Sequence, residues 1–159
     1  MKKFSVALLA LGVIPWIGPH AQQTATATFK VTARVNAVCE VTATDLAFGN
    51  YSQSLVRSST LLRATCTPNT TYNIGLDRGL AVSATETNRF MVAGPGLLNY
   101  GLYSDSAHSV PWGNTNGTNT VTGVGTGLAI DHTVFGTIPP NQPVPAGEYT
   151  DTITVRIYY

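Results

Sequence analysis

The residues from Thr24 to Val35 alternate between polar and apolar side chains without interruption. Side chains of a β-strand point to opposite faces with a period of two, so this pattern predicts a strand with one apolar and one polar face. Threonine, valine and phenylalanine favour strands, and neither proline nor glycine interrupts the stretch. The apolar side chains are Ala25, Ala27, Phe29, Val31, Ala33 and Val35. A single strand cannot bury its apolar face alone, so this one completes either its own sheet or the sheet of a neighbouring molecule.

The rest of the chain predicts further short strands separated by turns. Only 11% of the 159 residues are charged, against the roughly 25% that is usual in soluble domains. No window shows a sustained helical period, and evenly spaced short strands indicate an all-β sandwich or barrel. The expected strands are 37–43, 59–66, 72–76, 89–93, 97–103, 132–138 and 149–159, with a loop at 111–127.

The first 21 residues have the composition of a secretory signal peptide. Lys2 and Lys3 supply the positive start, residues 4–17 the apolar run, and Pro19-His20-Ala21 the end with small residues. The apolar run is shorter than the roughly 20 residues that a membrane-spanning helix needs. We therefore expect export and cleavage after Ala21.

The charge that remains after cleavage argues against nucleic acid as a partner. Without Lys2 and Lys3, seven basic residues stand against eight acidic ones, which is a net charge of −1. The mature chain has no basic patch with which to neutralise phosphates.

Two cysteines, Cys39 and Cys66, follow the signal peptide. In an oxidising compartment a lone pair of cysteines most simply forms one disulfide. The bond would close a loop of about 26 residues and contribute at most roughly 3.5 kcal/mol in the chain-entropy model. A metal site needs more ligands at ordered spacing, and the sequence offers none, so we expect no metal and no cofactor.

A series of short motifs runs through nearly all of the mature chain. In chain order they are Phe29-x-Val31 followed by Cys39, Leu46-Ala47-Phe48-Gly49, Thr65-Cys66-Thr67-Pro68, Tyr72-x-x-Gly75-Leu76-Asp77-x-Gly79, Leu98-x-Tyr100-x-Leu102-Tyr103, Trp112-Gly113, Phe135-Gly136-x-Ile138-Pro139 and Ala146-Gly147-x-Tyr149-x-Asp151-Thr152. Each motif is weak alone, but the ordered series resembles the spore coat protein U domain family. That family includes pilin subunits of archaic chaperone–usher pili such as the Csu type.

The resemblance implies an incomplete immunoglobulin-like sandwich. A periplasmic chaperone lends the missing strand, and the N-terminal extension of the next pilin subunit then replaces it, with an outer-membrane usher catalysing the exchange. On this basis we expect a signal peptide at 1–21, a donor-strand extension at 22–33 and a pilin-like β-sandwich domain at 34–159.

The segment from Thr24 to Ala33 therefore has two interpretations. From the residues alone it is an ordinary first strand of its own sheet. The resemblance favours a donor strand, with Phe29 as chief anchor, Val31 beside it, and the alanines at 25, 27 and 33 in shallower pockets. We expect Val35 to belong to the domain's own first strand, which continues through Cys39.

The sequence gives little support to catalysis. His108 and His132 are expected at the surface or at strand ends, and no G-x-S-x-G nucleophile elbow is present. Asp105 and Asp131 are more simply loop-capping residues than metal ligands. Gly123 to Gly127 is glycine-rich but lacks the strand–turn–helix context of a phosphate loop. Trp112 suits core packing better than a sugar-binding platform.

Three functional hypotheses follow. The first is a structural pilus subunit polymerised by donor-strand exchange, exported to the cell surface and serving adhesion or biofilm formation. The second is a spore or cell-surface coat protein of the same fold. The third is a secreted carbohydrate-binding module.

Overall fold

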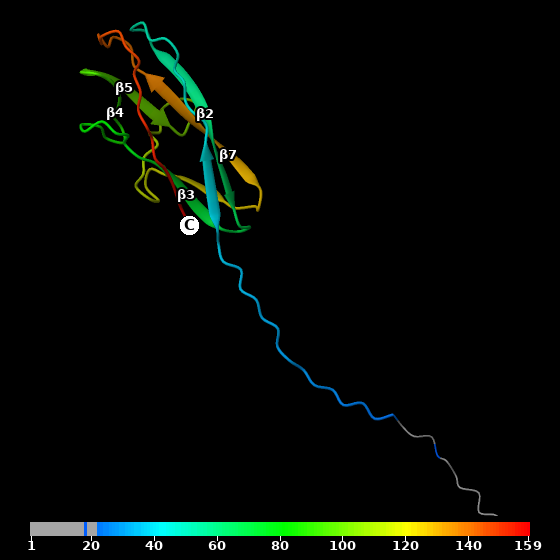
Figure 1. The fold of residues 1–159 in the computed structure, drawn as a ribbon. Coiled ribbons are helices and arrows are strands. Elements are labelled where there is room, and N and C mark those ends of the chain that lie inside the picture. Colours follow the sequence, from blue (N-terminus) through cyan, green and yellow to red (C-terminus); the bar gives the residue numbers. More distant parts are fainter. Residues whose placement is uncertain (1–17, 19–21) are drawn as a thin grey trace, which may run out of the picture. The chain divides into compact units, whose positions relative to one another are not determined.

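The computed structural model describes Gly18 and residues 22–159, so the predicted signal peptide lies almost entirely outside the described residues (Figure 1). The chain divides into two units, Met1–Arg34 and Val35–Tyr159. The regular secondary structure of the described residues is all β-strand. This part of the chain accordingly holds no helix of the length and apolarity that crossing a membrane requires.

The larger sheet has five antiparallel strands in the order β1-β2-β7-β5-β4. They are β1 (Cys39–Ala43), β2 (Val56–Cys66), β7 (Ala129–Ile138), β5 (Gly96–Tyr103) and β4 (Arg89–Ala93). Strands β2 and β7 lie side by side, paired from Val56 opposite Ile138 to Thr65 opposite Ala129 (Figure 1). Strands β4 and β5 form the hairpin that the sequence predicts.

The smaller sheet has three antiparallel strands in the order β6-β3-β8. They are β6 (Val121–Val124), β3 (Thr71–Leu76) and β8 (Val155–Tyr158). Strand β3 is central and pairs with β6 on one side and with β8 on the other. The edge strands are therefore β1 and β4 in the larger sheet and β6 and β8 in the smaller one.

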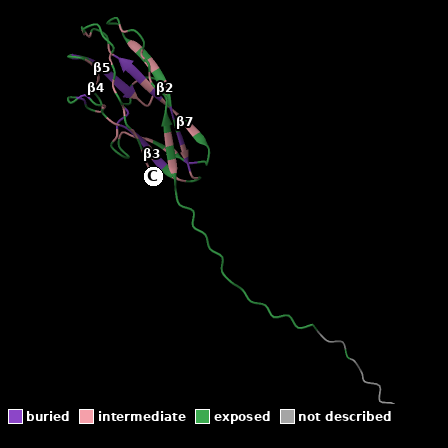
Figure 2. Ribbon diagram, viewed as in Figure 1, coloured by how far each residue is buried: buried purple, intermediate pink, exposed green. Residues whose placement is uncertain are grey.

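The inward-facing side chains of the two sheets form one core (Figure 2). Trp112 lies within it with 1% of its surface exposed, and its Nε1 donates a hydrogen bond of 2.7 Å to the carbonyl oxygen of Ile74. Trp112 is thus a core residue, as predicted. The other buried members are Leu62, Ala64, Cys66, Tyr72, Ile74, Leu76, Leu98, Tyr100, Leu102, Val134 and Ile138.

The predicted disulfide is confirmed. Cys39 and Cys66 face each other in the β1–β2 pair, with their Cα atoms 4.1 Å apart, and their sulfur atoms are bonded. The bond ties the edge strand β1 to β2, beside the buried end of β2. It constrains the unfolded chain over a separation of 27 residues.

The N-terminal segment forms no strand in residues 22–38. Phe29 is 87% exposed and Val31 81% exposed, so the apolar face of the predicted strand is open to solvent. The expectation that Val35 belongs to the domain's own first strand is wrong, because β1 begins at Cys39 and Val35 is itself 84% exposed.

Other boundaries also differ from the sequence-based expectation, and β2 and β7 each begin three residues earlier than predicted. The loop predicted at 111–127 contains β6, in which Gly123 faces Tyr72 of β3. A Cβ atom at position 123 would collide with the tyrosine ring, so glycine is needed there even though it usually weakens a strand. The last strand begins at Val155 instead of position 149, because the carbonyl oxygen of Asp77, which would continue the ladder, accepts a hydrogen bond from Arg89.

Candidate functional site

An open groove lies between one edge of each sheet. Its volume is about 470 Å³. The first wall is formed by residues 43–48, which lead away from β1, and the second wall by residues 149–155, which lead into β8. Edge strands present unpaired main-chain groups, so a groove of this kind can accept an additional strand. Its floor is apolar and comes from both sheets through Leu62, Leu76, Met91, Leu102 and Val134.

The first wall is held by hydroxyl groups of β2. Oγ1 of Thr60 donates a hydrogen bond of 2.7 Å to the carbonyl oxygen of Thr44. Oγ of Ser58 donates one of the same length to the carbonyl oxygen of Ala47. These side chains act where the main-chain ladder between β1 and β2 has ended, and they keep the wall beside the larger sheet.

The aromatic ring of Phe48 lies inside the first wall. It meets Tyr100 edge-on, with the ring centroids 6.0 Å apart. Gly136 of β7 makes this possible, because a Cβ atom at position 136 would collide with both Leu46 and Phe48.

The second wall is fixed at both ends and open between them. Thr150 pairs with Val92 of β4, accepting a hydrogen bond of 2.8 Å from its N–H and donating one of 3.3 Å to its carbonyl oxygen. At the other end Val155 faces Leu76 as the first residue of β8. Between these points the main-chain groups of Asp151 and Ile153 form no hydrogen bond with any residue in the described part of the chain.

A buried cation lies behind the second wall. Arg89 has no exposed surface, and its guanidinium group donates to four main-chain carbonyl oxygens. The bonds run from Nε to Asp77 at 2.8 Å, from Nη1 to Glu86 at 2.6 Å, and from Nη2 to Leu76 at 2.9 Å and Trp112 at 2.8 Å. Burial lowers the pKa of Arg89, although nearby acidic groups oppose the shift. Hydrogen bonds from one side chain thus join three separate parts of the main chain, at Leu76-Asp77, Glu86 and Trp112.

The lining of the groove also includes threonines and two aspartates, Asp45 and Asp151. Oδ2 of Asp151 accepts a hydrogen bond of 2.7 Å from the hydroxyl group of Tyr100. Burial raises the pKa of Tyr100, and the hydrogen bond to Asp151 and its negative charge raise it further. The phenol therefore remains a hydrogen-bond donor at any physiological pH.

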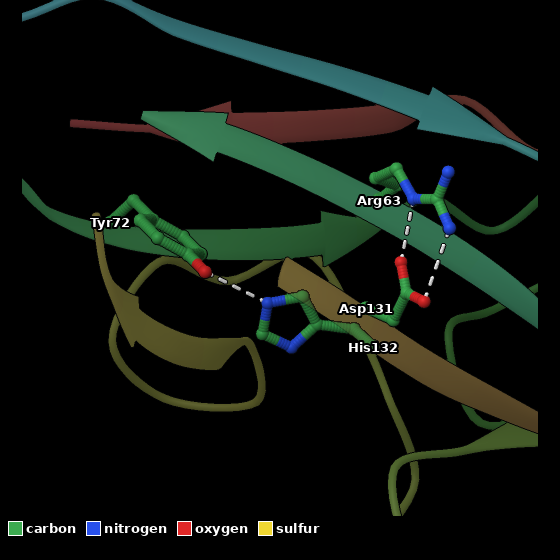
Figure 3. A network of polar contacts seen from close by, with 4 residues as sticks. All are labelled: Arg63, Tyr72, Asp131 and His132. Carbon is green, nitrogen blue, oxygen red and sulfur yellow. Dashed lines mark hydrogen bonds and ion pairs between the residues drawn. The ribbon is translucent and has the colours of Figure 1, made fainter. Parts of the chain in front are cut away.

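The two histidines are built into the domain instead of lying free at its surface. His132 is half-buried within β7, and its Nε2 shares a hydrogen bond of 2.9 Å with the hydroxyl group of Tyr72 (Figure 3). Nδ1 of His108 shares one of 2.6 Å with Oγ1 of Thr137. The prediction of surface or strand-end positions is therefore wrong for His132, which lies inside its strand. Both rings are bound to neutral hydroxyl groups.

The two aspartates considered as metal ligands have other partners. The carboxylate of Asp105 accepts hydrogen bonds from the main-chain N–H groups of Ser109 and Val110, as a loop-capping residue does. Asp131 forms an exposed ion pair with Arg63 at 2.7 Å (Figure 3). Among the described residues no group of three or more potential ligands could hold a metal ion.

The donor-strand residues Ala25, Ala27, Phe29, Val31 and Ala33 are all exposed in the structure, and their role in assembly stays a prediction. Sequence reasoning missed the polar groups that hold the walls of the groove. These groups include the carboxylates of Asp77 and Asp151, which belong to the motif series but were assigned no role from the sequence. An aspartate two residues before a glycine is a turn signal, so the sequence Asp77-Arg78-Gly79 could have predicted a capping role for Asp77.

Two antiparallel sheets, one disulfide and an open groove between edge strands define an immunoglobulin-like domain of the pilin class. The chain belongs to the Spore Coat Protein U domain family, whose model matches residues 25–156. It is 32% identical to Protein U of Myxococcus xanthus, in a match that spans 100% of this chain and 98% of that protein. The predicted fold class and family are thereby confirmed.

A solved structure supports the same fold. The chain matches part of the crystal structure of the CsuC–CsuE chaperone–tip adhesion subunit pre-assembly complex from archaic chaperone–usher Csu pili of Acinetobacter baumannii. The TM-score is 0.58 and the sequence identity 26%. The match covers 79% of this chain but only 40% of the matched chain, so this protein spans less than half the length of that relative.

Proposed function

We propose that this protein is a structural subunit of a chaperone–usher fimbria and that it polymerises by donor-strand exchange. Residues 22–33 of one copy enter the groove of the next copy and add a strand between its two walls, residues 43–48 and 149–155. The observation that carries the proposal is the open groove between two sheet edges. Strand addition pairs the free main-chain groups of such an edge, while alternate side chains fill apolar pockets.

The N-terminal segment has the chemistry that the groove requires. Its alternating face carries Phe29 and Val31, which are largely exposed in the single chain. Burial in an apolar groove would contribute about 1.5–3 kcal/mol for each of them. The alanines at positions 25, 27 and 33 fill shallower positions along the same face.

A chaperone and an usher complete the proposed pathway. An open apolar groove flanked by edge strands promotes aggregation, so a subunit needs a cover before it polymerises. The similarity to a structure that contains a chaperone and a Csu subunit supports a periplasmic chaperone as that cover. The subunit then passes through the outer-membrane usher to the cell surface, where the fimbria serves adhesion or biofilm formation without enzymatic activity.

The test is to substitute Phe29 with aspartate and to delete residues 22–33, each in the full chain co-expressed with its chaperone. Phe29→Asp places a carboxylate where the groove accepts an aromatic ring, and burying an unpaired charge is costly. Both variants should form a soluble complex with the chaperone, because their own groove is intact. Both should fail to produce the boiling-resistant ladder of polymers that the unchanged chain gives.

Thr28→Asp is the matched control, since it adds the same charge on the polar face of the segment and should leave the ladder intact. The proposal is wrong if Phe29→Asp polymerises like the unchanged chain. It is also wrong if either variant loses chaperone binding, because the segment would then belong to its own domain.

A coat protein of the same fold is the second candidate. The identity to Protein U over nearly the full length of both chains favours it. A coat protein without donor-strand exchange would reach the cell surface without forming boiling-resistant ladders, even when the chaperone is present.

A further inference from the structure

The second wall of the groove is extended although it lacks a continuous main-chain ladder. Residues 149–154 lie outside any strand, apart from the isolated bridge between Thr150 and Val92. A segment with so few main-chain bonds needs other contacts to hold one conformation. The carboxylates of Asp77 and Asp151 supply these contacts.

Asp77 takes the place of a ladder partner for Thr154. Its N–H donates to the carbonyl oxygen of Thr154 at 3.1 Å, as the next antiparallel pair after Leu76 and Val155 would require. The return bond does not end on the carbonyl oxygen of Asp77, which accepts from Nε of Arg89. Instead the N–H of Thr154 donates to Oδ1 of the Asp77 side chain at 3.0 Å.

The same oxygen of Asp77 also accepts a hydrogen bond of 3.0 Å from the N–H of Gly79. Burial acts to raise the pKa of this carboxyl group, but the hydrogen bonds from Thr154 and Gly79 outweigh it and hold the pKa below its usual value. Asp77 is therefore an ionised acceptor at neutral pH. Strand β8 therefore begins only at Val155, while the hydrogen bonds of Asp77 keep residues 149–154 aligned with it.

Asp151 holds the middle of the wall. Its Oδ1 accepts from the N–H of Leu80 at 2.9 Å and from the N–H of Thr152 at 2.8 Å. Its Oδ2 accepts from the hydroxyl group of Tyr100 in β5. The carboxylate thus joins the wall to the larger sheet and to the loop after β3.

These contacts leave one side of the wall free. The N–H groups of Thr150, Thr152 and Thr154 are all bound within the domain. In an extended chain the main-chain groups of alternate residues point to opposite sides. The N–H and C=O groups of Asp151 and Ile153 therefore point away from these partners, and both residues line the groove.

We propose that Asp77 and Asp151 are positioning residues for strand addition, which hold the second wall so that the main-chain groups of Asp151 and Ile153 are ready to pair with an incoming strand. This inference rests on the proposed function and deepens it. The incoming strand is the N-terminal segment of another copy. Its first ladder bonds form with Asp151 and Ile153, just before the first residue of β8.

The experiment uses the full chain carrying Phe29→Asp, purified as its chaperone complex, and a synthetic peptide of residues 22–33 labelled with a fluorophore. Asp77→Ala and Asp151→Ala are each added to this parent chain, and the rate of peptide uptake is followed by fluorescence anisotropy. We expect each to slow uptake about tenfold, the effect of losing one or two net hydrogen bonds. Asp77→Asn and Asp151→Asn, which keep an acceptor oxygen, should restore most of the rate.

Asp131→Ala removes an exposed carboxylate on the outer side of β7 and should take up peptide at the parent rate. If the parent complex takes up no peptide, the proposed function fails and takes this inference with it. If the parent takes it up and both alanine variants match the parent rate, the positioning role alone is wrong.

Hydrogen exchange decides the case in which the alanine variants do not fold. The chaperone itself covers the groove, so this measurement uses the parent chain released from the chaperone and kept dilute enough to stay monomeric. In that chain the amides of Asp151 and Ile153 should exchange fast before the peptide binds and at least tenfold more slowly afterwards, because ladder bonds protect them. The amides of Thr150 and Thr154 should be protected in both states. Protection of Asp151 and Ile153 before the peptide is added would overturn the proposal.

Discussion

The hydroxyl group of Tyr72 in β3 and Nε2 of His132 in β7 lie 2.9 Å apart and join the two sheets by a hydrogen bond. The rings meet edge-on at a centroid distance of 5.8 Å. Burial lowers the pKa of His132, and the negative charge of the neighbouring Asp131 opposes this shift only in part. The folded domain consequently favours the neutral imidazole.

The lowered pKa of His132 predicts a loss of stability in mild acid. Between the ordinary histidine pKa of about 6.5 and the lower pKa in the folded state, the unfolded chain binds more protons than the folded one. The contribution of neutral His132 to the free energy of unfolding is therefore present above about pH 6.5, and it is lost as the pH falls through the pKa of the folded state. Urea unfolding followed by the fluorescence of Trp112 should show that the stability advantage of the unchanged chain over His132→Gln shrinks from pH 8 to pH 5. A constant difference would contradict the prediction.

Arg89→Met should abolish the fold. The substitution removes the donor from two buried carbonyl groups, those of Leu76 and Trp112, and from two partly buried ones, those of Asp77 and Glu86. A buried group left unsatisfied costs about 1–3 kcal/mol, against a total stability of about 5–15 kcal/mol. Arg89→Lys should restore little of the stability, because a single ammonium group cannot donate to all four carbonyl oxygens as the planar, forked guanidinium group does. The yield of soluble chaperone complex measures the effect. Arg57→Met, at an exposed position of β2, is the control and should give a normal yield.

The disulfide should contribute strongly to stability. Replacing both cysteines with serine removes the constraint on the unfolded chain, which the chain-entropy model sets at roughly 3.5 kcal/mol as an upper value. We expect a lower midpoint in urea and faster degradation in the periplasm. Reduction of the unchanged chain should shift the midpoint by a similar amount, whereas equal midpoints with and without reductant would show that the bond matters little.

Local sequence signals were sufficient for much of the fold. The hairpin of β4 and β5 was predictable because Gly94 and Pro95 punctuate two apolar runs. Strand β6 was not predictable, because glycine is unfavourable in strands. Gly123 is needed there only because the ring of Tyr72 lies against it and leaves no room for a Cβ atom. That contact joins residues about 50 positions apart, and no local pattern carries it.

The same limit applies to the candidate site. The alternation around Phe29 is a property of neighbouring residues, so the sequence alone could indicate a donor strand. The start of β8 depends on Arg89, which donates to the carbonyl oxygen of Asp77, so that the β3–β8 ladder begins only at Val155. A turn signal at Asp77 could suggest a capping aspartate, but not that its carboxylate would bind Thr154.

Gly79→Ala should disturb the second wall of the groove more than backbone strain alone can explain. Gly79 has a φ of 82°, and Gly49 has a φ of 73°. An alanine at either position is strained by about 1–2 kcal/mol in this left-handed region. A Cβ atom at position 49 meets open space, whereas one at position 79 would collide with the carboxylate of Asp151.

Gly49→Ala is therefore the matched control, and the difference between the two variants measures the contact with Asp151. We expect Gly49→Ala to lower the urea midpoint slightly and to leave ladder formation unchanged. Gly79→Ala should lower the midpoint further and also reduce the ladder, because the displaced carboxylate releases the N–H groups of Leu80 and Thr152. Equal effects of the two substitutions on both measurements would show that the position of the Asp151 carboxylate does not govern the groove.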